Sequence, residues 1–210
     1  MRELLAGQHL IAVVTIEDSR DAVPLAEALV AGGITAIEVT LRTEAAVAGI
    51  GDIIRHVPEA LIGTGTVCTA QQIDLSVDLG CRYMVSPGFT DDLLNAAQQA
   101  SIPLLPGVST VSEVMRAMQF GYRDFKFFPA GASGGVAFIK ALQGPFKSVK
   151  FCPTGGVDVD NMADYLALGN VLAVGGSWVA SRALVRAKRW SEIERLARHV
   201  TSLNAGDISG

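Results

Sequence analysis

Short apolar stretches alternate with amphipathic stretches along the whole sequence, and this rhythm restricts the possible folds more than any other feature. Eight stretches are expected to form strands, at residues 9–16, 35–41, 61–67, 83–87, 103–108, 124–129, 150–156 and 171–177. Their starts are about 20–26 residues apart, which is the length of one strand, one helix and two short loops. Eight such units predict an α/β protein that folds as a single-domain (β/α)8 barrel over residues 1–210.

The segments between the strands carry the signals of helix starts and ends. Residues 19–33, 91–101 and 109–121 begin at a Ser or Asp, and glycine stands at the end of several segments. A doubly wound open sheet is the alternative to the barrel. The barrel is favoured by the number of units and by the polar residues at the carboxyl ends of many different strands, where barrel active sites are built.

The composition excludes several classes of protein. Hydrophobic residues make up 50% of the chain, the net charge is −4 and the pI is about 5.4. The sequence has no run of basic residues, which argues against binding to nucleic acid. The apolar run near the N-terminus is too short to span a membrane and lacks the features of a secretory signal, so we expect a cytoplasmic protein without a membrane partner.

The cysteines and histidines give no sign of a disulfide framework or a metal site. The three cysteines are scattered without a CxxC pair, which fits core residues of a protein in a reducing compartment. His9, His56 and His199 are far apart, so we expect no metal and no cofactor. Binding of Mg²⁺ to a substrate phosphate through carboxylates alone is the alternative.

Two predicted strands carry charges on a face that should be buried. In residues 124–129, DFKFFP, strand alternation puts Lys126 and Phe128 on the face opposite Phe125 and Phe127. In residues 35–41, TAIEVTL, Glu38 shares its face with Thr40 and with the Arg42 that follows. These faces would point into the barrel lumen, because the apolar faces pack on the helices. An internal ion pair is the structural interpretation, and an amine used for chemistry is the functional one.

Small residues end several other strands. In LIGTGTV, alternation puts Thr64 and Thr66 on one face, with glycines on the other face that would allow close approach of a helix. Thr66, at the strand end, can offer a hydroxyl to a ligand, and Pro87 can shape a turn or line a pocket wall.

The last two strands end in paired glycines. Gly155 and Gly156 follow the seventh strand, and Ser177 follows a second pair at the end of the eighth. Barrels often bind phosphate with these two loops through backbone N–H groups, so we expect a phosphate site there.

These groups together predict an aldol cleavage through an imine. The neutral amine of Lys126 can attack a ketone, and the resulting protonated imine is an electron sink. Glu38 is the strongest candidate for the proton transfers, and Arg42 suits bidentate capture of a carboxylate. The expected substrate is therefore a 2-keto acid with a phosphate at its far end. A phosphosugar isomerase or epimerase, and a barrel that only senses a sugar phosphate, are the alternatives; neither accounts for the lysine.

The sequence resembles a known family along most of its length. The motifs lie in the same order from about residue 9 to 180, and they are EVTLRT, GTGTV, VSPG, PGVSTVSE, FKFFPA, FCPTGG and VGGSW. They are similar to those of 2-keto-3-deoxy-6-phosphogluconate aldolase, the lyase of the Entner–Doudoroff pathway. The resemblance implies a metal-independent, Schiff-base aldolase with a (β/α)8 barrel that forms a homotrimer. It also implies cleavage of 4-hydroxy-2-oxoglutarate to pyruvate and glyoxylate.

The resemblance also implies a role for each matching residue. Lys126 would form the Schiff base, and Glu38 would be the general acid and base. The other expected contacts are Arg42 and Thr66 with the pyruvyl carboxylate, Pro87, Phe128 and Thr154 with the pocket, and Gly155, Gly156 and Ser177 with the phosphate. The sequence departs from the family in a short arm before His9 and in Gly131, where an acidic residue is expected. An aldolase for the galactonate-derived epimer, which differs only at C4, is the nearest alternative.

Overall fold

The computed structural model describes residues 1–206, with side chains as far as Leu203. Its strands are parallel and are β1 (Leu10–Val14), β2 (Ala36–Thr40), β3 (Leu61–Gly65), β4 (Tyr83–Val85), β5 (Leu104–Leu105), β6 (Gly107–Val108), β7 (Asp124–Phe127), β8 (Lys150–Pro153) and β9 (Val174–Gly176). The α-helices are α1 (Ala22–Ala31), α2 (Ala45–His56), α3 (Ala70–Asp78), α4 (Asp91–Gln98), α5 (Val111–Gln119), α6 (Gly135–Ala141), α7 (Met162–Leu166), α8 (Arg182–Arg186) and α9 (Trp190–Gly206). Two 3-10 helices are η1 (Ser19–Asp21) and η2 (Trp178–Ala180).

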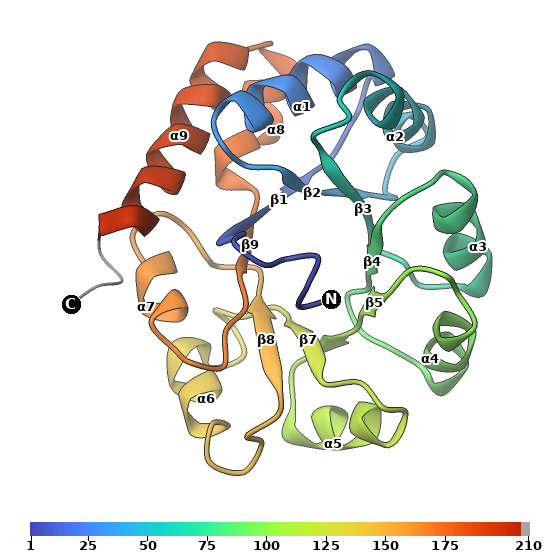
Figure 1. Cartoon of the computed structure of the whole chain (residues 1–210), viewed down its shortest axis with the longest axis vertical. Coiled ribbons are helices and arrows are strands. Elements are labelled where there is room, and N and C mark those ends of the chain that lie inside the picture. The colour runs from blue at the N-terminus through green and yellow to red at the C-terminus, as the bar shows by residue number, and fades with distance from the viewer. Residues whose placement is uncertain (207–210) are drawn as a thin grey trace.

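The strands form a ring that the helices surround (Figure 1). Strand pairing runs in the order β5-β4-β3-β2-β1-β9 and, in a second group, β6-β7-β8. β5 and β6 flank Pro106, whose missing N–H interrupts what is otherwise one strand. Bridges from Phe151 to Val171 and from Thr154 to Gly175 join β8 to the β9 segment. The ring therefore has the eight strand positions of the predicted (β/α)8 barrel, and this prediction is confirmed.

Two apolar regions hold the barrel together. The larger region lies between strands and helices, and there the ring of Phe127 stacks on Phe138 of α6 at 4.9 Å between centroids. The smaller region fills the lumen with residues such as Ile11, Tyr83 and Leu105. Leu5 belongs to this region, and the N-terminal segment lies across the centre of the ring in Figure 1. The lumen is therefore packed at that end, which leaves the carboxyl ends of the strands for a site.

The helix boundaries follow the local signals in the sequence. Thr69 and Thr110 form capping boxes with Gln72 and Glu113 at the starts of α3 and α5. Gly121 follows α5 with a φ of 86°, a left-handed value that suits glycine. No helix within residues 1–206 combines the length and the hydropathy that crossing a membrane requires.

Candidate active site

Lys126 on β7 and Glu38 on β2 form an ion pair inside the barrel. The distance from Lys126 Nζ to Glu38 Oε1 is 3.2 Å, and the two side chains are 5% and 3% exposed. The prediction that both charges point into the lumen is confirmed, since Phe125 and Phe127 pack instead in the outer core. The pair offers a buried amine beside a proton acceptor.

Phe128 shares the lumen face with Lys126, as strand alternation predicts. The ammonium lies 5.2 Å from the centroid of the Phe128 ring. This distance allows a cation–π attraction, and the ring also separates one side of the amine from water.

The glycines of β3 face the barrel lumen and not the surrounding helices. A methyl group on Gly65 would overlap the carboxylate of Glu38, and one on Gly63 would overlap the ring of Tyr83. Thr64 points outward, where its hydroxyl lies 2.7 Å from Ser76 of α3. The prediction that these glycines allow a helix to approach is therefore wrong, because the glycine face of β3 is the inner face.

Thr66 lies just beyond β3, so its side chain does not follow the alternation of faces along the strand. Its φ is 63°, so its backbone turns out of the extended conformation at this residue. The prediction that Thr66 lies on the same face as Thr64 is wrong for this reason. Arg42 Nε donates a hydrogen bond of 2.9 Å to the Thr66 hydroxyl, so the two residues that were expected to hold a carboxylate are in contact.

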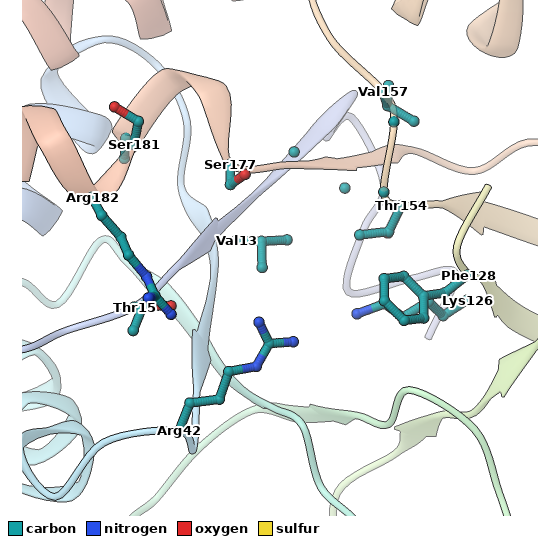
Figure 2. Close-up of a pocket in the computed structure, with 15 residues that line it drawn as sticks. Val13, Thr15, Arg42, Lys126, Phe128, Thr154, Val157, Ser177, Ser181 and Arg182 are labelled. Carbon is teal, nitrogen blue, oxygen red and sulfur yellow. The ribbon is translucent and has the colours of Figure 1, made fainter. Parts of the chain in front are cut away.

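A cavity of about 350 Å³ opens at the carboxyl ends of β1, β2, β7, β8 and β9 (Figure 2). It brings together seven residues of the predicted site, which are Arg42, Lys126, Phe128, Thr154, Gly155, Gly156 and Ser177. Gly175 and Gly176, the second glycine pair of the expected phosphate site, also line it. The sequence interpretation did not name six further lining residues, which are Val13, Thr15, Val157, Ala180, Ser181 and Arg182. Strand alternation would have found Val13 and Thr15, which share the inner face of β1.

Three predicted residues do not line this cavity. Glu38 lies almost wholly buried and bonds Lys126, and Thr66 bonds Arg42. Pro87 follows β4, and its backbone occupies the space that a side chain at Gly107 would need. Contact of Pro87 with a substrate stays a prediction.

The two glycine-rich strand ends meet at one side of the cavity. Gly155 and Gly156 have φ values of 86° and 77°, left-handed values that turn the backbone at the end of β8 and that suit glycine. Gly175 leaves room for the Thr154 side chain, since a methyl group there would overlap its hydroxyl. The backbone N–H groups of successive turn residues can form a concave surface that suits an anion.

Acidic groups near the ion pair are held in their neutral forms. Burial, followed by the Glu38 carboxylate, raises the pKa of the Cys152 thiol to about 12. Burial and Glu38 likewise raise the pKa of the Tyr83 phenol well above its ordinary value. Within the described residues, no cluster of three or more His, Cys, Asp or Glu side chains has the arrangement of a metal site.

The arrangement supports chemistry on a ketone with anionic groups at both ends. The amine of Lys126 can form a covalent bond to a carbonyl carbon, and Glu38 is close enough to exchange its proton. Arg42 and the glycine turns offer donors for anions on the two sides of this amine.

Known proteins share this sequence and this structure. The family model described as KDPG and KHG aldolase matches residues 1–196. A KHG/KDPG aldolase of Escherichia coli K12 is 49% identical over 195 residues, which are 93% of this chain and 92% of that protein.

Two solved structures bear on the chemistry of the site. A KDPG aldolase of Legionella pneumophila, with pyruvate captured as a covalent carbinolamine, has 47% identity and a TM-score of 0.92, with coverage of 95% of this chain and 97% of that one. The 2-keto-3-deoxy-6-phosphogluconate aldolase of Zymomonas mobilis with 3-phosphoglycerate has 41% identity, a TM-score of 0.86 and coverage of 95% and 94%. The family model and these relatives extend over nearly the whole chain. The chain therefore belongs to the KDPG and KHG aldolase family.

Proposed function

We propose that the protein cleaves 2-keto-3-deoxy-6-phosphogluconate to pyruvate and glyceraldehyde 3-phosphate through a Schiff base. The observation that carries this proposal is the buried contact of 3.2 Å between Lys126 and Glu38 at the base of a cavity with anion donors. An isomerase or a sensor of sugar phosphates would need the glycine turns but not this pair. The family membership of the chain supports the same activity.

The proposed reaction begins with transfer of a proton from Lys126 to Glu38. The free amine attacks C2 of the substrate, and loss of water from the carbinolamine gives the protonated imine. A carboxylate then takes the proton of the C4 hydroxyl, and the C3–C4 bond breaks as its electron pair moves into the imine. Glyceraldehyde 3-phosphate leaves, C3 of the enamine takes a proton, and water releases pyruvate and the amine. We assign these proton transfers to Glu38, directly or through one water.

Different residues are proposed to bind the two anionic ends of the substrate. Arg42 is proposed to bind the pyruvyl carboxylate, because it lines the cavity and its Nε is held by a hydrogen bond to the Thr66 hydroxyl. Gly155, Gly156 and Ser177 are proposed to receive the phosphate through backbone N–H groups and a hydroxyl. Phe128 and Thr154 line the space between these ends. Pro87, which follows β4, is proposed to contact the substrate from outside the residues that line this cavity.

Trapping with borohydride tests the proposed chemistry directly. The protein is incubated with pyruvate and sodium borohydride, its intact mass is measured, and the modified peptide is mapped. We expect one stable adduct on Lys126 and none on the Lys126→Met variant. Absence of an adduct on folded protein would refute the imine mechanism, and an adduct on another lysine would keep the mechanism and move the site.

The stereochemistry at C4 separates the main substrate from its epimer. We propose that the gluconate-derived substrate is cleaved faster than the galactonate-derived one, and that 4-hydroxy-2-oxoglutarate is also cleaved. Rates of pyruvate release from the three compounds, coupled to lactate dehydrogenase, test this order. A faster reaction of the galactonate-derived epimer would reverse the proposal on substrate and leave the mechanism intact.

We further propose that residues 1–210 act as one catalytic barrel in a cytoplasmic homotrimer of the Entner–Doudoroff pathway that uses no metal. Analytical ultracentrifugation tests the trimer, and cell fractionation tests the compartment. Full activity after dialysis against EDTA would support a reaction without a metal, whereas a loss that Mg²⁺ restores would contradict it.

A further inference from the structure

We propose that Arg182 binds the phosphate of the substrate and thereby sets the preference of this enzyme for phosphorylated 2-keto acids. The inference rests on the proposed function and adds a specificity-determining residue to it. Arg182 is the first residue of α8, beyond the last strand, and it lines the same cavity as Lys126. Figure 2 shows its side chain extending from the side of the cavity that holds Ser177 toward Thr15.

Arg182 is the cation of this cavity that no group of the described residues holds closely. Its Nη1 lies 4.0 Å from Oε1 of Glu17, which is the limit of an ion pair. Glu17 is instead held by Arg186, which donates two hydrogen bonds of 2.5 and 2.8 Å to its two oxygens. The hydrogen bond from Arg186 lowers the pKa of Glu17, so this carboxylate stays charged and bound at neutral pH. Two guanidinium groups face one carboxylate, which leaves one positive charge in excess.

The other two cations of the cavity have a partner or a proposed role elsewhere. Lys126 is paired with Glu38, and Arg42, whose Nε donates to Thr66, is proposed to bind the pyruvyl carboxylate. On the side of the glycine turns, the donors from the last two strand ends are neutral N–H groups and the hydroxyl of Ser177. A phosphate monoester carries close to two negative charges, and a guanidinium can bind two of its oxygens at once. Arg182 is placed to supply the charge that the glycine turns lack.

The length of the substrate explains why this contact discriminates. When C2 is attached to Lys126, the phosphate of 2-keto-3-deoxy-6-phosphogluconate lies beyond C6. In 4-hydroxy-2-oxoglutarate the terminal carboxylate is bonded directly to C4. This shorter substrate ends near the reacting bond, so it cannot share the phosphate contact with Arg182. Removal of the guanidinium should therefore affect the two substrates unequally.

The test compares Arg182→Ala with wild type on both substrates. We expect the KM for 2-keto-3-deoxy-6-phosphogluconate to rise about tenfold or more, with kcat within about twofold, because one charged hydrogen-bond contact in binding is lost. The kinetic constants for 4-hydroxy-2-oxoglutarate should stay within about twofold. Inorganic phosphate should also inhibit cleavage of this shorter substrate less strongly in the variant.

Two further variants make the result specific. Arg189→Ala removes a nearby exposed arginine that pairs with Glu192 outside the cavity, and it should change neither substrate. Arg42→Lys should impair both substrates, because both carry the pyruvyl carboxylate. If Arg182→Ala loses kcat/KM equally on both substrates, or loses none on the phosphorylated one, the inference about Arg182 is overturned. The proposed function still holds in that case, provided that the wild-type protein cleaves the phosphorylated substrate. A wild-type protein that does not cleave the phosphorylated substrate would overturn both.

Discussion

Lys126 Nζ and Glu38 Oε1 lie 3.2 Å apart although their strands, β7 and β2, stand on opposite sides of the ring. Each charge alone would be costly to bury, and their pairing offsets part of that cost. The same contact provides the route by which the ammonium can lose its proton before it attacks a ketone. The feature that makes a buried lysine tolerable is therefore also the one that makes it usable.

Replacing Glu38 by Gln should slow the reaction without removing the lysine. The amide keeps the size of the side chain but accepts no proton, so kcat should fall by about 10²–10⁴-fold. Steady-state assays of pyruvate release measure the effect, and circular dichroism checks the fold because Lys126 loses its counter-charge. The matched control is Glu44→Gln, which removes an exposed carboxylate at the N-cap of α2. An unchanged kcat in Glu38→Gln would remove Glu38 from the mechanism.

Strand periodicity explains why the central pair could be predicted. Side chains of a strand alternate between two faces, and in a barrel one face must be the lumen. The apolar Phe125 and Phe127 identify the outer face of β7, which leaves Lys126 inside. The same rule applied to β2 puts Glu38 inside, and closure of the ring brings the two together.

Other parts of the site could not be read from this periodicity. In β3 both faces carry small residues, so alternation could not decide which face was inside, and the glycines were assigned to the wrong layer. Thr66 has a positive φ, and alternation no longer holds after such a residue. Arg182 belongs to a helix that follows β9, where its orientation depends on tertiary packing and not on strand order.

Gly65→Ala should impair catalysis although Gly65 itself takes no part in the reaction. The added methyl group would overlap the Glu38 carboxylate, which would have to leave its present position beside Lys126. A displacement of this kind can cost about 10²-fold in kcat. The matched control is Gly144→Ala, since a methyl group there meets no atom within 4 Å. If kcat of Gly65→Ala equals that of the control, the position of Glu38 is not set by β3.

Tyr83→Phe should make the protein more stable. The Tyr83 hydroxyl is buried, and no group within the described residues is its hydrogen-bond partner. An unsatisfied buried polar group costs about 1–3 kcal/mol, so its removal should raise the free energy of unfolding by about 1 kcal/mol or more. Urea denaturation measures the change. Tyr122→Phe is the comparison, because that hydroxyl donates to the Leu94 carbonyl at 3.3 Å and its loss should be neutral or destabilising. Destabilisation by Tyr83→Phe would mean that the hydroxyl is satisfied in solution.

The three cysteines should differ sharply in reactivity. Burial raises the pKa of both Cys81 and Cys152 to about 12, whereas Cys68 is exposed. The thiolate is the reactive form, so one thiol should react with Ellman's reagent at pH 8 in the native protein and three after unfolding. Cys68→Ser should reduce the native count to none. Rapid native labelling of a second thiol would contradict the burial of the other two.

The same buried thiols should weaken the fold at alkaline pH. An unperturbed thiol has a pKa of 9.0, so the unfolded chain releases these protons at a lower pH than the folded chain, where Cys152 titrates at about 12. The contribution to stability is therefore fully present below pH 9 and is lost as the pH rises from 9 toward 12. Urea denaturation between about pH 8 and 10.5 should show a steeper decline for wild type than for Cys152→Ala, which has no thiol to ionise at this position. Parallel declines would mean that the Cys152 thiol ionises as readily in the folded lumen as in the unfolded chain, and that its burial beside Glu38 does not hold it neutral.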